Sequence, residues 1–225
     1  MLVAPRRPVR LDQMPAAPAP VAEVRARVMA GMVAAVEDKG YASTTIADIA
    51  KAARISRRTL YEHFADKEAC FLAAYSMMAD ELITAVVSAS RAVPGGMERL
   101  NAASMAYLNF LAATPEVSRS FLTEINAVGQ AGVELRCTVN QRFAAMMNDL
   151  VIESVGEIGT QLPDGRYLRA FDTTMALALV GAINELVVQA IVVGPADTLP
   201  VRLSRLSGPV LELSERMLLS DAAPE

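Results

Sequence analysis

Residues 44–68, TTIADIAKAARISRRTLYEHFADKE, constrain the fold of this chain more than any other stretch. Their first half carries an apolar stripe with the spacing i, i+3, i+4 and i+7, which predicts a short helix. The stripe consists of Ile46, Ile49, Ala50 and Ala53. Ser56 is suited to cap a second helix that buries Leu60 and Phe64. Only two residues separate the first helix from that cap, so the two helices must cross steeply, and the small side chain of Ala50 allows this. The spacing predicts a helix-turn-helix, whose second helix lies in the DNA major groove.

A wider segment, residues 25–75, resembles the N-terminal domain of TetR-family transcriptional regulators. The residues that carry the resemblance are Gly40, Tyr41, Thr44, Thr45, Ile46, Ile49, Ala50, Ala53, Ile55, Ser56, Thr59, Leu60, Tyr61, His63, Phe64, Lys67 and Glu68. The chain departs from the family at Arg54, where a turn glycine is usual. A left-handed conformation at Arg54 costs roughly 1–2 kcal/mol; the alternative is a reshaped turn.

The second helix of the motif is expected to carry the DNA contacts. Arg57 and Arg58 are candidates to read guanine edges, and Thr59 can meet a base edge or a thymine methyl. Phosphate contacts are expected from Thr45, at a helix start, and from residues that the family resemblance implies, Tyr61 and Lys67. Packing of the Tyr61 ring and a plain surface role for Lys67 are the alternatives. The predicted DNA-binding set is Thr44, Thr45, Ser56, Arg57, Arg58, Thr59, Tyr61, His63 and Lys67. His63 is expected to make a packing or backbone contact rather than to act as a ligand or base.

Charge is distributed unevenly along the chain, whose net charge is −4. Residues 1–67 hold 11 Lys and Arg against 7 Asp and Glu, or +4, whereas residues 68–225 hold 10 against 18, or −8. A basic N-terminal third on an acidic remainder is expected where only that third meets phosphate; chance clustering is the alternative. Residues 1–20 contain five prolines and are predicted to form a disordered arm, either touching DNA through its arginines or solvated without a role.

Composition favours an all-α protein, because strand formers are sparse and Ala, Leu, Met and Arg are common. We expect about nine helices: a three-helix DNA-binding head at residues 21–68 and a larger helical body at residues 69–225. The body is predicted to bind an effector and to form the dimer. Cys70 and Cys137 belong to no ligand-spaced cluster, so free buried thiols are expected, with no metal and no cofactor.

The body helices are expected to enclose an apolar pocket for an unidentified hydrophobic small molecule, since methionine-rich linings suit ligands of variable shape. Asn184 and Glu124 are candidate polar anchors. The predicted lining is Tyr107, Phe110, Phe121, Glu124, Phe143, Met146, Met147, Met175 and Asn184. The same spacings also describe an ordinary hydrophobic core, which is the alternative.

The C-terminal third predicts a dimer interface. Residues 167–193 form an apolar helix; a membrane span is the less favoured alternative, because three polar residues lie together inside it. A last helix carries apolar residues at spacings of four and three, a seam suited to helix packing, with Pro209 expected to kink it. A four-helix homodimer interface is the prediction, also implied by the family, and packing within one subunit is the alternative. The predicted interface is Leu179, Ile183, Val187, Leu203, Leu206, Val210, Leu213 and Met217.

Together these features predict a cytoplasmic, ligand-responsive repressor that binds a pseudo-palindromic double-stranded operator as a homodimer. A transcriptional activator and a helical interaction module without effector binding are the alternatives. An enzyme is not expected, since the sequence has no G-x-S-x-G, P-loop or dinucleotide fingerprint and a single histidine.

Overall fold

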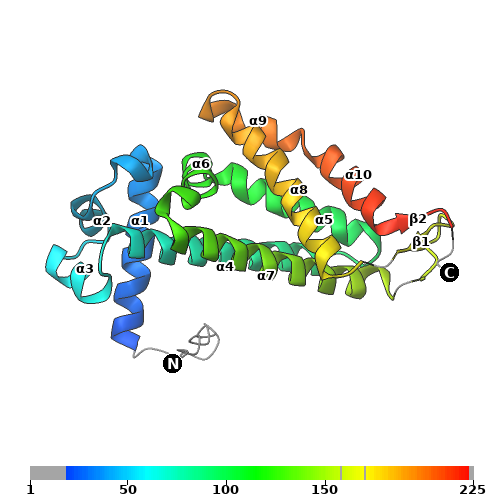
Figure 1. Ribbon diagram of the computed structural model, residues 1–225, viewed down its shortest axis with the longest axis horizontal. Coiled ribbons are helices and arrows are strands. Elements are labelled where there is room, and N and C mark those ends of the chain that lie inside the picture. The colour runs from blue at the N-terminus through cyan, green and yellow to red at the C-terminus, as the bar shows by residue number, and fades with distance from the viewer. Residues whose placement is uncertain (1–18, 158, 170, 223–225) are drawn as a thin grey trace, which may run out of the picture.

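The computed structural model describes residues 19–157, 159–169 and 171–222, so most of the predicted N-terminal arm lies outside the described residues. The described part is helical except for short loops and one two-residue ribbon, which confirms the predicted all-α class (Figure 1). The α-helices are α1 (Ala19–Ser43), α2 (Ile46–Ala52), α3 (Arg57–His63), α4 (Lys67–Arg91), α5 (Met97–Ala113), α6 (Pro115–Glu124), α7 (Gln130–Val155), α8 (Thr173–Val192), α9 (Leu199–Ser204) and α10 (Ser207–Leu218). Single 3-10 turns occur at η2 (Ile125–Val128) and η3 (Ala196–Thr198), and the strands are β1 (Tyr167–Leu168) and β2 (Leu219–Ser220).

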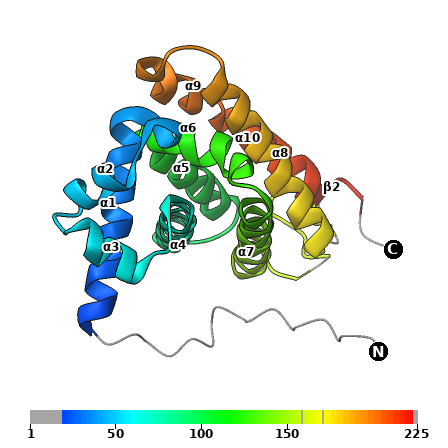
Figure 2. The ribbon, with the colours of Figure 1, turned by 60° about the vertical axis from the view of Figure 1, so that its left-hand side comes forward.

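The head is built by α1, α2 and α3, which lie together at one end of the molecule (Figures 1 and 2). Thr45 and Ser56 cap α2 and α3, each accepting a hydrogen bond from the backbone N–H three residues on, which confirms the predicted helix starts. Helices α1 and α2 approach so closely that a Cβ at Gly31 would lie 2.8 Å from the carbonyl oxygen of Ile49. Glycine on α1 therefore sets the depth at which α2 docks.

Helix α4 links the head to the rest of the molecule. Asp66 caps it by accepting a hydrogen bond from the N–H of Ala69, and the helix then extends along the body beside α7 (Figure 1). Its first half belongs to the head core, which also contains residues of α6, η2 and α7. Its second half, from Leu82, belongs to a separate body core. One rigid element thus contributes to both hydrophobic cores.

The cysteines differ from each other in burial. Cys70 is buried in the head core as predicted, and burial raises the pKa of its thiol to about 12. Cys137 is exposed on α7, so the prediction that both thiols are buried was wrong for it. Both are free thiols.

The body is completed by α5, α6, α8, α9 and α10 (Figure 2). Pro115 occupies the first turn of α6, and the hydroxyl of Thr114 before it makes no capping hydrogen bond. Residues 167 and 168 form β1 rather than helix, pairing antiparallel with β2, and α8 begins only after Asp172 caps it. This corrects the predicted helix start, because Asp172 supplies the acceptor that the first turn of α8 needs.

The predicted last helix is two helices, α9 and α10. Pro209 does not kink a continuous helix, because it lies in the first turn of α10. Backbone N–H groups in a first turn have no intrahelical acceptor, so proline loses no hydrogen bond there. By length and composition alone, α4 and α8 are apolar enough to cross a membrane. Each, however, contributes buried residues to the protein's own hydrophobic core.

Candidate DNA-binding surface and effector cavity

Helix α3 presents its polar face outward. Arg57 and Arg58 are exposed; the Arg58 side chain is 90% exposed and forms an ion pair of 3.2 Å with Glu62. Tyr61 is 55% exposed, an unusual position for an aromatic ring. On the opposite face Leu60 is fully buried. The helix therefore keeps an arginine- and tyrosine-bearing surface free while it is anchored from behind.

Two arginines of α1, which the sequence analysis did not single out, hold α3 and the turn before it. Arg25 donates a hydrogen bond of 2.9 Å to the carbonyl of His63, at the end of α3, and its guanidinium lies 4.3 Å from the centre of the Phe64 ring. Arg27 donates to the carbonyls of Ala53 and Arg54, both at 2.8 Å. The backbone carbonyl of His63 accepts the hydrogen bond from Arg25, which is consistent with the backbone contact predicted for His63.

Arg54 adopts the left-handed conformation, with φ 54°. Among the described residues it is the only non-glycine residue with positive φ. The alternative of a reshaped turn is therefore excluded, and the turn keeps the glycine-like geometry with an arginine in place.

Thr44 must be removed from the predicted DNA-contacting side chains. It is only 2% exposed, and its hydroxyl donates to the carbonyls of Ala35 and Gly40. The hydroxyl is occupied in tying the end of α1 to the start of α2. Thr45 is exposed, but it forms a capping box with Asp48, whose carboxylate accepts the Thr45 N–H at 2.9 Å and pairs with Lys39 at 2.8 Å. These contacts, first of all that with Lys39, hold the pKa of Asp48 well below its usual range.

Lys67 lies at the first position of α4, half-buried against the head. Its ammonium is 4.2 Å from the centre of the Tyr41 ring and donates a hydrogen bond of 3.1 Å to the Tyr41 carbonyl. This combines a cation–π contact with a charge-assisted hydrogen bond. Ser56 and Thr59 share a hydrogen bond between their hydroxyls at 2.9 Å, so both are engaged in capping α3.

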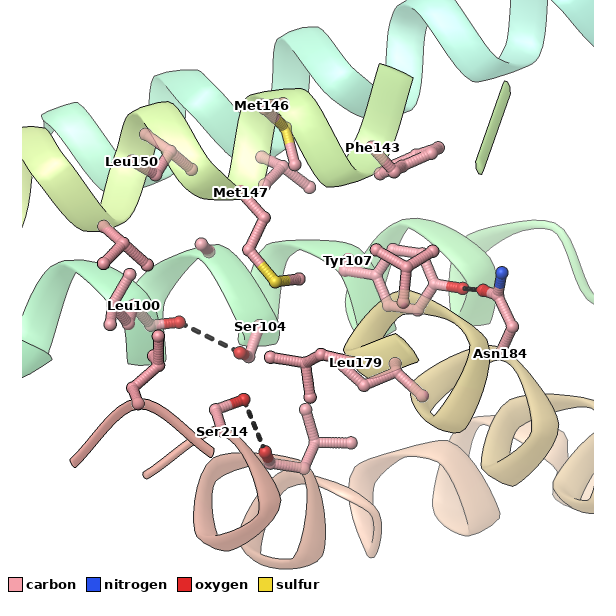
Figure 3. A pocket seen from close by; sticks show the side chains of 17 residues that line it. Leu100, Ser104, Tyr107, Phe143, Met146, Met147, Leu150, Leu179, Asn184 and Ser214 are labelled. Carbon is pink, nitrogen blue, oxygen red and sulfur yellow. Dashed lines mark hydrogen bonds between the residues drawn. The ribbon is translucent and has the colours of Figure 1, made fainter. Parts of the chain in front are cut away.

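Two cavities lie in the body. The larger, here called the distal cavity, has a volume of about 70 Å³ and is enclosed by α4, α5, α7, α8 and α10 (Figure 3). Five residues of the predicted effector pocket line it: Tyr107, Phe143, Met146, Met147 and Asn184. Ser214, which was not predicted from the sequence, also lines it; this residue directly follows Leu213 of the apolar seam on the last helix.

The polar side chains of the distal cavity already have hydrogen-bond partners. Ser104 donates to the carbonyl of Leu100 and Ser214 donates to the carbonyl of Val210. The Tyr107 hydroxyl donates to Asn184 Oδ1 at 2.8 Å (Figure 3). Burial raises the pKa of Tyr107, so this hydroxyl stays protonated and acts as a donor. None of the residues lining this cavity in the described part of the chain is charged.

A second, proximal cavity of about 60 Å³ lies against the head core. Phe110 and Phe121 line it, as do Tyr107, Phe143 and Asn184, which are shared with the distal cavity. Glu124 and Met175 line neither cavity. Met175 is 38% exposed in the first turn of α8, and Glu124 lies at the end of α6, close to Gly40. These two pocket assignments are corrected: Met175 lies in the first turn of α8, before the residues that line the cavities, and Glu124 lies beyond Leu122, the last residue of α6 that lines one.

The predicted dimer-interface residues lie on inward faces. Five of them are at most 8% exposed in a single subunit: Leu179, Ile183, Val187, Leu203 and Val210. The remaining three, Leu206, Leu213 and Met217, are partly buried against the same body core. For these five buried residues the prediction is corrected in favour of packing within one subunit, whereas the interface role of Leu206, Leu213 and Met217 stays a prediction. The 4-3 spacing identified an apolar seam, but the seam is covered by the chain's own helices.

A capped helix-turn-helix at one end of an all-α body with apolar cavities is the arrangement expected of a DNA-binding transcriptional regulator. Residues 32–74 match the family of bacterial regulatory proteins named tetR. The matched segment, which contains the helix-turn-helix, therefore resembles the DNA-binding domain of TetR-family regulators.

One similar protein is the HTH-type transcriptional activator FasR of Mycolicibacterium smegmatis, 26% identical over 142 residues. The match spans 58% of this chain and 65% of that relative, so the chain covers just under two thirds of its length. A TetR-family regulator of Pectobacterium atrosepticum has the same fold, with TM-score 0.69 and 21% identity over 90% of this chain and 98% of that one. The regulator FadR of Bacillus subtilis, solved with stearoyl-CoA, gives TM-score 0.61 and 19% identity over 84% and 96%.

Proposed function

We propose that this chain is a cytoplasmic, ligand-responsive repressor that binds a pseudo-palindromic operator as a homodimer. The observation that carries the proposal is α3, a helix anchored by a buried leucine and two α1 arginines, whose exposed face bears Arg57, Arg58 and Tyr61. Arginine can bind guanine O6 and N7 with two hydrogen bonds, which makes it suited to read the major groove.

We assign base reading to Arg57, Arg58 and Thr59, and phosphate contacts to Tyr61, Thr45 and Lys67. Arg58 must release Glu62 to reach a base, which costs little because both side chains are exposed. Lys67 needs only to tilt its ammonium away from Tyr41 to reach a phosphate, since the residue is half-buried at a helix start. Ser56 serves DNA binding by fixing the start of α3.

The effector is proposed to be a hydrophobic small molecule bound in the body. Apolar side chains and already satisfied polar groups line the distal cavity, so a ligand gains there mainly from burying apolar surface. The FadR of Bacillus subtilis was solved with stearoyl-CoA, and a fatty acyl group is the effector class that we infer for this chain.

The dimer is proposed to form through the outward faces of α8 and α9. Leu177, Val192 and Val201 are exposed there at 38%, 56% and 53%. Exposed apolar side chains that the subunit itself leaves uncovered are natural dimer contacts. Two copies related by a twofold axis would place two α3 helices on successive major grooves of a pseudo-palindrome.

Selection of bound sites from a random DNA pool tests the proposal. A pseudo-palindrome with half-sites about one helical turn apart is the expected result; the absence of any enriched sequence would overturn it. Activation is the second candidate, because the relative FasR is named a transcriptional activator. In vitro transcription from a template with the selected site separates the two: a repressor lowers transcript yield, and an activator raises it.

A further inference from the structure

The two cavities of the body are separated by a single layer of side chains. Tyr107, Phe143 and Asn184 line both of them. The rings of Tyr107 and Phe143 pack edge to face with centres 6.1 Å apart. The Tyr107–Asn184 hydrogen bond lies at one end of the distal cavity (Figure 3). The wall between the cavities is therefore side chain, not backbone, and it can move without unfolding a helix.

A short chain of hydrogen bonds holds this wall across three helices. The hydroxyl of Tyr107 on α5 donates to Asn184 Oδ1 on α8, and Asn184 Nδ2 donates to Asn140 Oδ1 on α7 at 3.1 Å. Asn140 itself lines the proximal cavity. Moving the Tyr107 side chain breaks one hydrogen bond and leaves the Asn184 oxygen without its donor. The wall is thus closed by a specific bond, and opening it has a defined cost.

The sizes of the cavities show which molecule needs the wall to open. At about 70 and 60 Å³, each is far smaller than the roughly 300–1,000 Å³ of typical small-molecule sites. Joined end to end they make a longer but narrow site. The passage between them opens when one side chain of the wall moves aside, so it is only about as wide as that side chain. A slender, unbranched chain fits that passage, whereas a branched or polycyclic ligand does not.

We propose that the Tyr107–Asn184 hydrogen bond is a gate between two compartments of one elongated site, whose occupant carries a long unbranched aliphatic chain. This rests on the proposed effector site. A short chain occupies the distal compartment with the gate closed. A long chain displaces Tyr107 and enters the proximal compartment, which is lined by Tyr75, Ala79 and Phe121 of the head core. Only long chains therefore reach the core that supports the DNA-binding helices.

The test compares octanoic and palmitic acids, and their coenzyme A thioesters, by calorimetric titration of the full-length protein. In Tyr107→Phe the gate bond is absent, so palmitoyl ligands are expected to bind about five-fold tighter, the equivalent of about 1 kcal/mol. Octanoyl ligands are expected to bind as to the wild type. Tyr167→Phe is the matched control: it makes the same change on β1, at a residue that lines neither cavity, and leaves the gate bond intact, so binding of neither chain length should change.

Ala79→Leu provides a second, independent arm by filling the proximal compartment from α4. Palmitoyl binding is expected to fall at least ten-fold in this variant, while retained octanoyl binding shows that the protein is folded. If Tyr107→Phe changed the affinities for octanoyl and palmitoyl ligands equally, the proposed gate would be wrong, whereas the proposed effector site would still hold. Failure of every chain to bind the wild type would overturn the proposed effector site itself. The acid and thioester arms identify whether the free acid or the acyl thioester is the ligand.

Discussion

The guanidinium of Arg27 donates a hydrogen bond of 2.8 Å to the carbonyl oxygen of Arg54, the left-handed residue in the turn of the helix-turn-helix. The same Arg27 nitrogen also donates to the carbonyl of Ala53. Helix α1 therefore holds the strained turn from outside. This explains how an arginine can occupy a backbone conformation that favours glycine.

Relief of this strain is measurable. Arg54→Gly is expected to raise the free energy of unfolding by about 0.5–1 kcal/mol. Glycine removes the strain of the left-handed conformation, about 1–2 kcal/mol for a residue with a Cβ. Part of this gain is offset because glycine also increases the conformational entropy of the unfolded chain. Urea denaturation gives the value. Arg54→Ala is the control, since it removes the charge and keeps the strain. Equal stability of the glycine and alanine variants would contradict the strain argument.

The close approach of α1 and α2 predicts a loss of stability in Gly31→Ala. A Cβ there would lie 2.8 Å from the backbone nitrogen of Ala53 and 2.8 Å from the carbonyl oxygen of Ile49, and backbone cannot yield as a flexible side chain can. We expect a loss of about 1–3 kcal/mol, measured by thermal unfolding, with weaker operator binding because α2 is displaced. Gly208→Ala in α10, where nothing lies within 4 Å of an added Cβ, should be neutral or slightly stabilising.

The helix-turn-helix could be predicted from sequence because its signals are local. The predicted cap at Ser56 depends only on residues up to three positions away, and the structure has it. For Arg54 the sequence left two alternatives open, a left-handed conformation and a reshaped turn, and the structure has the first. The support given by Arg25 and Arg27 could not be predicted, since it joins residues 26 to 38 positions apart in sequence.

The dimer face and the cavity walls were harder to predict for a physical reason. Apolar spacing shows that one side of a helix is buried, but it does not show whether the chain's own helices or a partner's cover it. Leu179 and Leu203 had the expected spacing and proved to be fully buried within the subunit. Met175 was assigned to a pocket by its residue type, and its helix turns it outward. Asn140, which accepts a hydrogen bond from the gate residue Asn184, gave no signal in the sequence beyond that of a polar residue on an apolar helix.

The capping box at α2 predicts a dependence of stability on pH. The pKa of Asp48 is lowered in the folded protein, chiefly by its bond to Lys39. Its contribution to stability is therefore complete above the unfolded pKa of about 4 and is lost as pH falls further toward the folded pKa. The melting temperature of the wild type should exceed that of Asp48→Asn by a constant amount from about pH 5 to 7. This difference should shrink as the pH falls below about 4. A gap that is unchanged at pH 3 would rule out this linkage.

Salt dependence separates the two kinds of DNA contact that we propose. Lys67→Ala is expected to lower the slope of log K against log salt by about 1 and to weaken all sequences alike, because a phosphate contact releases counterions. Arg58→Ala should lose about 1–3 kcal/mol mainly at one base position. Binding titrations over a range of salt on the selected operator and on single-base variants provide both numbers. A sequence-selective loss for Lys67→Ala, with an unchanged slope, would contradict its phosphate role.

Helix α8 offers a direct test of the face that we propose for the dimer, because Leu177 and Leu179 lie two positions apart on opposite sides of it. Leu177 is 38% exposed and Leu179 is fully buried. Leu177→Glu should leave the fold intact and weaken the dimer at least ten-fold, since about 1.4 kcal/mol of lost contact is enough for that change; sedimentation equilibrium measures it.

Leu179→Ala should instead cost about 2–5 kcal/mol of subunit stability through the cavity it leaves. Ile152→Glu, on an exposed site of α7, is the control for adding a charge to an apolar surface position and should not change the oligomeric state. If Leu177→Glu stays dimeric at concentrations where Ile152→Glu does, the dimer must form elsewhere. The exposed apolar side chains of α8, Leu177 and Val192, would then need another partner to cover them.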